Sequence, residues 1–169
     1  MPSPIPDLRW QPLAPADADA VRALADTAHA ELPERTEVFA EKIRLFPAGC
    51  RKIVHAGRLA AYGIAHPWLL DSPPPIDTFL GALPAAADCL HLHDAVVSPG
   101  LRGRNTGIAY IEEMAAVARA HGLATLTLVS VYGTYRLWSR CGFVERSTPA
   151  LAAKLAVYGP TARYMTRAA

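Results

Sequence analysis

Three segments in the middle of the chain carry hydrophobic patterns that predict regular structure. Residues 89–97, "CLHLHDAVV", are nearly free of charge, which is typical of a buried strand. Residues 105–122 repeat hydrophobic positions at helical spacing, and a terminal glycine ends the helix. One face of this helix is expected to hold Ile108, Ile111, Ala115 and Ala118. Residues 123–131, "LATLTLVSV", alternate and predict a second strand, so 89–131 forms a βαβ unit.

Weaker patterns on both sides of this unit predict further elements. Upstream we expect a short strand at 8–13, a helix after a possible cap at Asp17, a second helix over Glu34–Phe46, and a hairpin with strands at 50–55 and 59–66. Downstream we expect a short helix at 133–142 and strands within 143–148 and 162–168. Residues 69–88 contain three consecutive prolines and predict an irregular segment, and residues 1–6 predict a loose N-terminus.

The order of these elements predicts an α/β (α+β) fold. We expect a mixed, mostly antiparallel, twisted sheet of six to seven strands, flanked by about four helices and with one parallel pair at its centre. The 169 residues contain neither a repeat nor a linker, which favours a single domain over 1–169.

Composition narrows the classes of function and location. A net charge of +2, with no basic run longer than two residues, argues against a nucleic-acid partner. The three cysteines lack CxxC spacing, which favours free thiols in a reducing compartment and no metal site. The chain shows neither a signal-peptide pattern nor a membrane-spanning stretch, so we expect a cytoplasmic protein with no membrane partner. Its richness in Ala, Pro and Arg suggests a GC-rich bacterial genome.

The segment between the predicted strand and helix has the properties of an anion-binding turn. The stretch "SPGLRGRNTG" leads from the strand directly into the start of the helix. Unpaired amides and the helix dipole favour a phosphate there, and the small residues Gly103 and Gly107 allow close backbone approach. Arg102 and Arg104 add positive charge. The alternative is an ordinary strand-to-helix turn with two solvated arginines.

These motifs together resemble the GCN5-related N-acetyltransferase (GNAT) superfamily. Its pattern [RQ]-x-x-G-x-[GA] falls on residues 102–107, and its Y/W-x-x-x-G-F segment falls on "WSRCGF" at 138–143. The resemblance implies a GNAT fold and acetyl-CoA as cosubstrate. It implies that a splayed strand offers the backbone of Ala95, Val96 and Val97 to the pantetheine arm. It also implies that the pyrophosphate is held by Arg102, Gly103, Arg104, Asn105, Thr106, Gly107 and Ile108, with Trp138 in the cofactor wall.

One position in the turn departs from the family pattern. Asn105 replaces the middle glycine. Asparagine tolerates a left-handed backbone, so we expect the turn to be retained, and its side chain could cap the helix that follows. It could also crowd the pyrophosphate.

The strand before the turn carries two histidines at alternate positions. His91 and His93 share one face of a regular strand, with Asp94 on the other face unless a bulge brings it round. Histidine titrates near neutrality and suits a general base that deprotonates an ammonium group. The pair resembles the His-x-His of arylalkylamine N-acetyltransferases, which implies a proton relay with His93 as the preferred base. The alternative is two sheet residues packed under a helix.

The general acid is less clear from the sequence. Many relatives have a tyrosine where this chain has Trp138, and an indole cannot donate a catalytic proton near neutral pH. Tyr132, Tyr135 or water could protonate the thiolate instead. Cys141 is more simply interpreted as a packed small residue than as a nucleophile.

The sequence predicts an N-acetyltransferase that acts by direct attack of a primary amine, with a small molecule as the expected partner. Side chains that could line the acceptor pocket are His66, Trp68, Asp71 and Tyr62, although ordinary loop packing explains each. Two alternatives remain: a non-catalytic module that binds or senses acyl-CoA, and a protein or peptide N-acetyltransferase. A homodimer is possible, and the acceptor is not identified.

Overall fold

The computed structural model describes residues 8–169, so the expected loose segment at 1–6 lies outside the described residues. Its seven strands are β1 Gln11–Pro12, β2 Arg51–His55, β3 Arg58–Trp68, β4 Cys89–Val97, β5 Thr125–Ser130, β6 Val144–Glu145 and β7 Arg163–Ala168. Its α-helices are α1 Ala18–Ala28, α2 Thr36–Leu45, α3 Thr106–Ala120, α4 Tyr135–Arg140 and α5 Pro149–Leu155. Short 3-10 turns lie at Pro15–Asp17, Pro47–Gly49, Pro99–Leu101 and Ala156–Tyr158.

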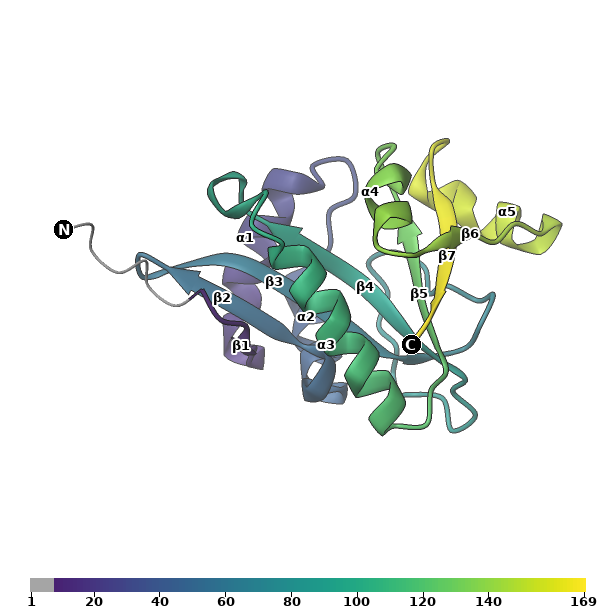
Figure 1. The fold of residues 1–169 in the computed structure, drawn as a ribbon, viewed down its shortest axis with the longest axis horizontal. Coiled ribbons are helices and arrows are strands. Elements are labelled where there is room, and N and C mark those ends of the chain that lie inside the picture. The colour runs from purple at the N-terminus through teal and green to yellow at the C-terminus, as the bar shows by residue number, and fades with distance from the viewer. Residues whose placement is uncertain (1–7) are drawn as a thin grey trace.

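The strands form one seven-stranded sheet in the order β1-β2-β3-β4-β5-β7-β6. All neighbouring pairs are antiparallel except β4 and β5, which are parallel. Helix α3 covers one face of the sheet, and α1 and α2 cover the other (Figure 1). The predicted α/β fold with a central parallel pair is therefore confirmed, with seven strands and five α-helices in the described residues.

The parallel pair separates along its length. Strands β4 and β5 pair only at Leu90–Leu126, His91–Thr127 and Leu92–Leu128. Beyond this point β4 continues to Val97, still paired with β3, while β5 turns away toward β7. Figure 1 shows the two strands diverging toward the top of the view. We call the region between the two diverging strand backbones, bordered by the second half of β4, the wedge.

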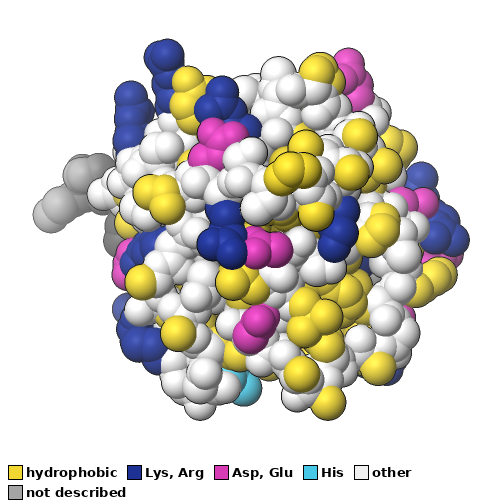
Figure 2. Space-filling model, turned by 90° about the vertical axis from the view of Figure 1, so that its right-hand side faces the viewer, with side chains coloured by type: hydrophobic (Ala, Val, Ile, Leu, Met, Phe, Trp, Pro, Cys, Tyr) yellow, Lys and Arg dark blue, Asp and Glu magenta, His cyan; other side chains and the backbone are white. Residues whose placement is uncertain are grey.

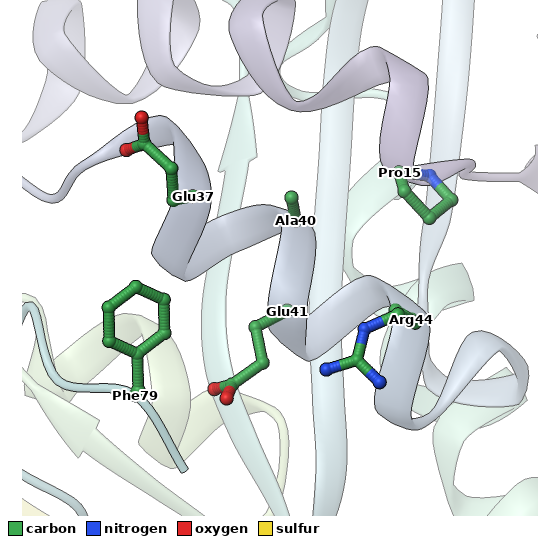
Figure 3. Close-up of a pocket in the computed structure, with 6 residues that line it drawn as sticks. All are labelled: Pro15, Glu37, Ala40, Glu41, Arg44 and Phe79. Carbon is green, nitrogen blue, oxygen red and sulfur yellow. The ribbon is translucent and has the colours of Figure 1, made fainter. Parts of the chain in front are cut away.

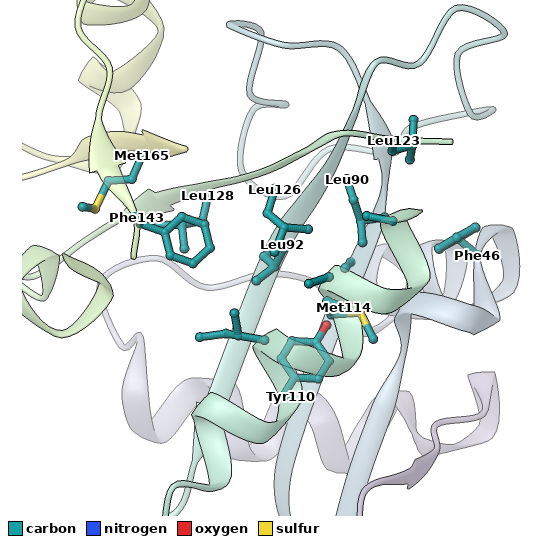
Figure 4. Packing of buried hydrophobic residues seen from close by; sticks show 14 residues of the cluster. Phe46, Leu90, Leu92, Tyr110, Met114, Leu123, Leu126, Leu128, Phe143 and Met165 are labelled. Carbon is teal, nitrogen blue, oxygen red and sulfur yellow. The ribbon is translucent and has the colours of Figure 1, made fainter. Parts of the chain in front are cut away.

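The larger hydrophobic core lies between the sheet and α3 (Figure 4). Leu90 and Leu92 of β4 pack there with Tyr110, Ile111 and Met114 of α3. Of the helix face predicted from the sequence, Ile111, Ala115 and Ala118 are buried. Ile108 belongs to the same helix face but is 47% exposed, so the buried part of that face begins at Ile111. It lies in the first helical turn, near the end of the sheet.

A second hydrophobic cluster lies between the opposite face of the sheet and the two N-terminal helices. Val21 and Ala25 of α1 and Phe39 and Ile43 of α2 pack there against residues of β3 and β4, including Tyr62. Because Leu90 and Leu92 face α3, strand alternation directs His91 and His93 to this second face. The histidine pair therefore lies on the side of the sheet that α1 and α2 cover.

The predicted hairpin, the irregular segment 69–88 and the C-terminal strands all form, but helix α5 was not predicted. Its sequence carries a clear start signal, because Pro149 occupies the first helical position and the Thr148 hydroxyl accepts from the Leu151 amide. Asp17 precedes α1 but makes no side-chain cap to it. Instead it binds Lys52 at 2.7 Å. No helix within residues 8–169 is both long enough and apolar enough to cross a membrane.

Candidate active site

The turn between β4 and α3 has the backbone geometry that an anion site requires. Asn105 lies at φ +58° and ψ +17°, the left-handed conformation expected when it replaces glycine. Its side chain makes no hydrogen bond to cap α3, so the proposed capping role was wrong. The Ala109 amide donates to the Asn105 carbonyl at 3.0 Å and closes the first turn. The amides of Thr106, Gly107 and Ile108 therefore precede the first intrahelical bond and are available to a ligand.

The predicted arginines lie at the mouth of this turn. Both Arg102 and Arg104 are exposed, and Arg102 Nε donates to the Val97 carbonyl at 3.1 Å. A Cβ atom added at Gly103 or Gly107 would meet no other atom within 4 Å. The free protein thus has open space at both glycines, which is the space that close approach of a phosphate needs.

A residue that the sequence analysis did not identify fixes the start of α3. Trp10 Nε1 donates to the Thr106 carbonyl at 3.0 Å, and its ring lies 5.1 Å from that of Tyr110. The Thr106 hydroxyl is buried and donates to the Leu101 carbonyl at 3.2 Å. The Thr106 side chain is therefore structural, and only its amide faces the expected ligand.

Substitutions at Asn105 test the left-handed conformation. Asn105→Val is expected to lower the free energy of unfolding by about 1–2 kcal/mol, since a β-branched residue is poorly tolerated at positive φ. Asn105→Gly is expected to change it by less than about 0.5 kcal/mol. Urea denaturation measures both values. Equal stability of the two variants would contradict the conformation described for this turn.

The second half of β4 offers a free edge to the wedge. Ala95, Val96 and Val97 pair with Gly63, Tyr62 and Ala61 of β3. Within the described residues, none of them pairs with β5. Alternate backbone groups along this segment therefore point into the wedge, where an extended ligand can add to the edge as a strand would.

A β-bulge marks the point where the parallel pair ends. Ile64 of β3 opposes Asp94, whereas Ala65 opposes Leu92, so His93 is the extra residue on β4. The bulge turns Asp94 onto the same face as His93. The strand is therefore not regular, and of the two alternatives left open for Asp94 the bulge is the one that the structure confirms. Three ionisable side chains of β4, His91, His93 and Asp94, consequently face the N-terminal helices.

His93 is held by a carboxylate from the α1–α2 connection. Its Nε2 lies 2.8 Å from Glu34 Oε1, and the two side chains are 4% and 9% exposed. Burial pushes the pKa of Glu34 upward, but the adjacent His93 and Lys42 outweigh burial and hold that pKa at about 2. Because an ionised carboxylate only accepts hydrogen bonds, Nε2 of His93 carries a hydrogen and Nδ1 is the nitrogen that can exchange a proton.

His91 has a different environment. It is buried, and its Nδ1 shares a hydrogen bond of 2.9 Å with Thr127 Oγ1 of β5. Burial, together with His66 and His93, holds the pKa of His91 well below its usual range. His66 of β3 is also buried, and its Nε2 has no partner among the described side chains. His91 is therefore neutral at physiological pH. It can pass a proton on, but it does not stay protonated.

The Glu34–His93 pair predicts a specific acid sensitivity. The pKa of Glu34 is lower in the folded protein than its ordinary value of 4.5, so its ionised form stabilises the fold. This contribution, up to about 3 kcal/mol, is complete above pH 4.5 and is lost as the pH falls toward 2. The free energy of unfolding should therefore fall more steeply over this range in wild type than in Glu34→Gln.

The exposed residue Glu37 supplies the matched control for that experiment. The Glu37→Gln variant should follow the wild-type pH dependence in urea titrations. Parallel curves for wild type and Glu34→Gln would contradict the ion pair.

A second histidine–carboxylate pair lies beside the first. His29, the residue that ends α1, places Nε2 at 2.9 Å from Asp94 Oδ1. The other Asp94 oxygen accepts a hydrogen bond from the Tyr62 hydroxyl at 2.5 Å. The His29 ring stacks on Tyr132, which follows β5, with centroids 5.8 Å apart. His29 thus bridges the two diverging strands, and nothing in the local sequence pattern identified it.

The α4 side chains have mainly structural contacts. Trp138 Nε1 donates to Thr134 Oγ1 at 3.2 Å, and its ring meets Phe143 edge-on. Tyr135 is turned toward Arg163, whose guanidinium lies 3.9 Å from the ring centroid. Cys141 packs partly against the larger core, and burial raises the pKa of its thiol, as expected for a packing residue.

Hydrogen bonds and ion pairs hold the irregular segment 69–88 in place, and one of them involves Glu34, the partner of His93. Glu34 Oε2 also accepts from the Asp77 amide at 3.1 Å, and Arg35 forms an ion pair with Asp77 at 3.1 Å. At the other end, Arg146 binds Asp71, and the Tyr158 hydroxyl donates to the Pro74 carbonyl. Of the side chains predicted for an acceptor pocket, His66 lies in the histidine cluster, and the Trp68 ring meets it edge-on with centroids 5.3 Å apart. Tyr62 adjoins the cluster through Asp94, whereas Asp71 stabilises the loop.

A separate hollow of about 340 Å³ lies on the outer side of α2 (Figure 3). It is lined by Pro15, Glu37, Ala40, Glu41, Arg44 and Phe79, none of which was predicted to function. On the face shown in Figure 2, Lys and Arg side chains are dispersed among acidic and hydrophobic ones.

The seven-stranded mixed sheet, with one diverging parallel pair and α3 packed across it, is an α/β fold of the GNAT type. Residues 19–143 match the acetyltransferase (GNAT) family, and the chain belongs to that family. No curated protein matches it.

Solved structures share the fold at low sequence identity. Ard1 from Thermoplasma volcanium has a TM-score of 0.71 and 15% identity, over 95% of this chain and 96% of that one. The ribosomal-protein-S18-alanine N-acetyltransferase from Escherichia coli has a TM-score of 0.62 and 19% identity, over 95% and 92%. PaiA N-acetyltransferase from Thermoplasma acidophilum, in complex with coenzyme A, has a TM-score of 0.65 and 10% identity, over 95% and 98%.

Proposed function

We propose that this protein transfers an acetyl group from acetyl-CoA to the primary amine of a small molecule. The observation that carries the proposal is the position of the buried Glu34–His93 pair at the bulge, where β4 and β5 separate. A histidine there lies beside the free edge of β4, along which the pantetheine arm would extend. The amine and the thioester would meet at the bulge.

In this proposal the cofactor is bound mainly by backbone groups. Ala95, Val96 and Val97 pair with pantetheine, and the amides from Gly103 to Ile108 hold the pyrophosphate, with Arg102 and Arg104 contributing charge. Trp138 contributes to the wall of the cofactor site beside the pantetheine arm. Among the described residues, no group of three or more His, Cys, Asp or Glu side chains is arranged to hold a metal ion.

His93 acts as the general base. The ionised Glu34 holds Nε2–H, so Nδ1 of His93 accepts the proton that the ammonium group loses before attack. His91 relays the proton onward, as in the arylalkylamine-type arrangement that the sequence resembles. Tyr132 lies at the end of the wedge and contacts the thioester end of the cofactor.

The contacts around 69–88 favour a small acceptor. This segment is joined to the α1–α2 connection through Asp77 and to the C-terminal part through Asp71, Ser72 and Pro74. These contacts fix 69–88 beside the Glu34–His93 pair, and we take them as favouring a small amine over a folded protein.

Release of free coenzyme A thiol from acetyl-CoA in the presence of a panel of amines and N-terminal peptides tests the proposal. Turnover with small primary amines, and little with peptides, is expected. Turnover with peptides alone would make the protein a peptide N-acetyltransferase. Binding of acetyl-CoA without turnover on any amine would favour the acyl-CoA-sensing alternative, which Asn105 and Trp138 motivate.

A further inference from the structure

The second half of the transfer reaction also needs a proton. When the tetrahedral intermediate collapses, the coenzyme A sulfur leaves as a thiolate, and a nearby acid assists by protonating it. Trp138, at the position of the usual tyrosine, cannot supply that proton, and its N–H is bonded to Thr134. Tyr135 is turned away toward Arg163. Among the described residues, the site therefore requires a donor from another element.

His29 lies where such a donor is needed. It contacts Asp94 on the unpaired half of β4 and stacks on Tyr132 at the end of β5, so it spans the opening of the wedge. Its side chain is 21% exposed, so part of the ring, though not Nδ1, reaches the surface. Its Nδ1 is buried and has no hydrogen-bond partner among the described residues. A buried ring nitrogen without a partner is unusual and is consistent with a bond formed only when ligand is present.

We propose that His29, held by Asp94 and Tyr62, is the general acid that protonates the departing coenzyme A sulfur. This assignment rests on the acetyltransferase function proposed above. It gives the site two histidine–carboxylate pairs with opposite tasks, in which His93–Glu34 accepts the amine proton and His29–Asp94 donates to sulfur. Tyr132 then serves as the surface on which His29 stacks.

The acid strengths of the candidate groups favour His29 over Tyr132. Burial lowers the pKa of His29, but Asp94 and Glu34 outweigh it and raise that pKa above its usual value. An imidazolium is ordinarily a far stronger acid than a phenol, with a pKa of about 6.5 against about 10. Burial and the charge of Glu31 raise the pKa of Tyr132 above 10, so transfer from that phenol would be uphill.

The proposed step balances in atoms and charge. The carbon–sulfur bond breaks, and its electron pair remains on sulfur. Nδ1–H of the His29 imidazolium gives its proton to that sulfur, which forms the free thiol. His29 is left neutral, with Nε2–H still donated to Asp94, and solvent returns a proton to Nδ1 before the next cycle.

The pH dependence of kcat, at saturating amine and acetyl-CoA, tests this assignment. Groups facing His29 are Asp94 of β4, Tyr62 of β3, Glu34 of the α1–α2 connection and Tyr132 after β5. His29→Gln is expected to lower kcat about 100-fold and to abolish its alkaline decline, with the acetyl-CoA Kd within about threefold of wild type. Tyr132→Phe should retain the alkaline decline.

Two further measurements test whether His29→Gln loses activity only because its fold is disturbed. His55→Gln, at an exposed position in the β2–β3 hairpin, is the matched control and should leave kcat and its pH profile unchanged. In wild-type protein with ¹⁵N-labelled histidine, adding coenzyme A should shift the Nδ1 resonance of His29 more than that of His55.

The outcomes separate the two proposals. Wild-type kcat and an intact alkaline decline in His29→Gln would overturn the assignment of His29 and leave the acetyltransferase function standing. Loss of the decline in Tyr132→Phe alone would transfer the role to the phenol. Failure of wild-type protein to bind acetyl-CoA would contradict the proposed function itself.

Discussion

Replacing His93 by alanine is expected to lower kcat by about 10²- to 10³-fold while the acetyl-CoA Kd changes by less than about twofold. General acid–base groups contribute rate factors of this order. The cofactor contacts proposed here come from the backbone of β4 and the start of α3, which the imidazole does not supply. Steady-state kinetics with calorimetric titration of acetyl-CoA separates the two quantities.

Two companion variants make this prediction decisive. Alanine at 93 leaves the Glu34 carboxylate buried without its partner, which can lower stability. His93→Gln can still donate a hydrogen bond to Glu34 but cannot accept the amine proton, so it should lose turnover with smaller loss of stability. Normal turnover in the double His91→Ala, His93→Ala variant would remove the base assignment.

Gly107→Val is expected to weaken acetyl-CoA binding by about 100-fold, equivalent to about 2.7 kcal/mol. Gly107 is the second residue of α3, and a β-branched side chain there would occupy the space into which the pyrophosphate must come. A Cβ at this position meets no atom of the protein within 4 Å, so the free protein should fold normally. Calorimetric titration gives the affinity, and thermal unfolding gives the stability.

Ala116→Val is the matched control because it adds the same kind of side chain to an exposed position further along α3. It should bind acetyl-CoA as wild type does. An unaltered affinity in Gly107→Val, with both variants folded, would show that the turn does not approach the phosphate.

The βαβ unit could be predicted because each of its elements carries a strong local signal. The strand at 89–97 was predicted with its observed bounds, and α3 was predicted to within two residues at each end. Gly103, Asn105 and Gly107 indicated the turn because their backbone requirements are local. Helix α5 was missed although Thr148-Pro149 is a start signal, since its short sequence lacks a long hydrophobic period.

The polar organisation of the site could not be predicted from the same patterns. Glu34 and His29 lie 59 and 65 residues from their partners on β4, and nothing local connects them. The bulge at His93 depends on a one-residue difference in pairing between β3 and β4, which hydrophobic alternation does not specify. The histidine pair and Asp94 were therefore visible in the sequence, whereas Glu34, which orients His93, and His29, which binds Asp94, were not.

Backbone donors at the start of α3 and along β4 are expected to bind coenzyme A. Calorimetric titration of the purified protein with acetyl-CoA at low and moderate salt tests it directly. The account predicts saturable binding at one site per chain, which Gly107→Val weakens and Ala116→Val does not. The absence of any binding heat or thermal stabilisation with acetyl-CoA, in folded wild-type protein, would contradict it.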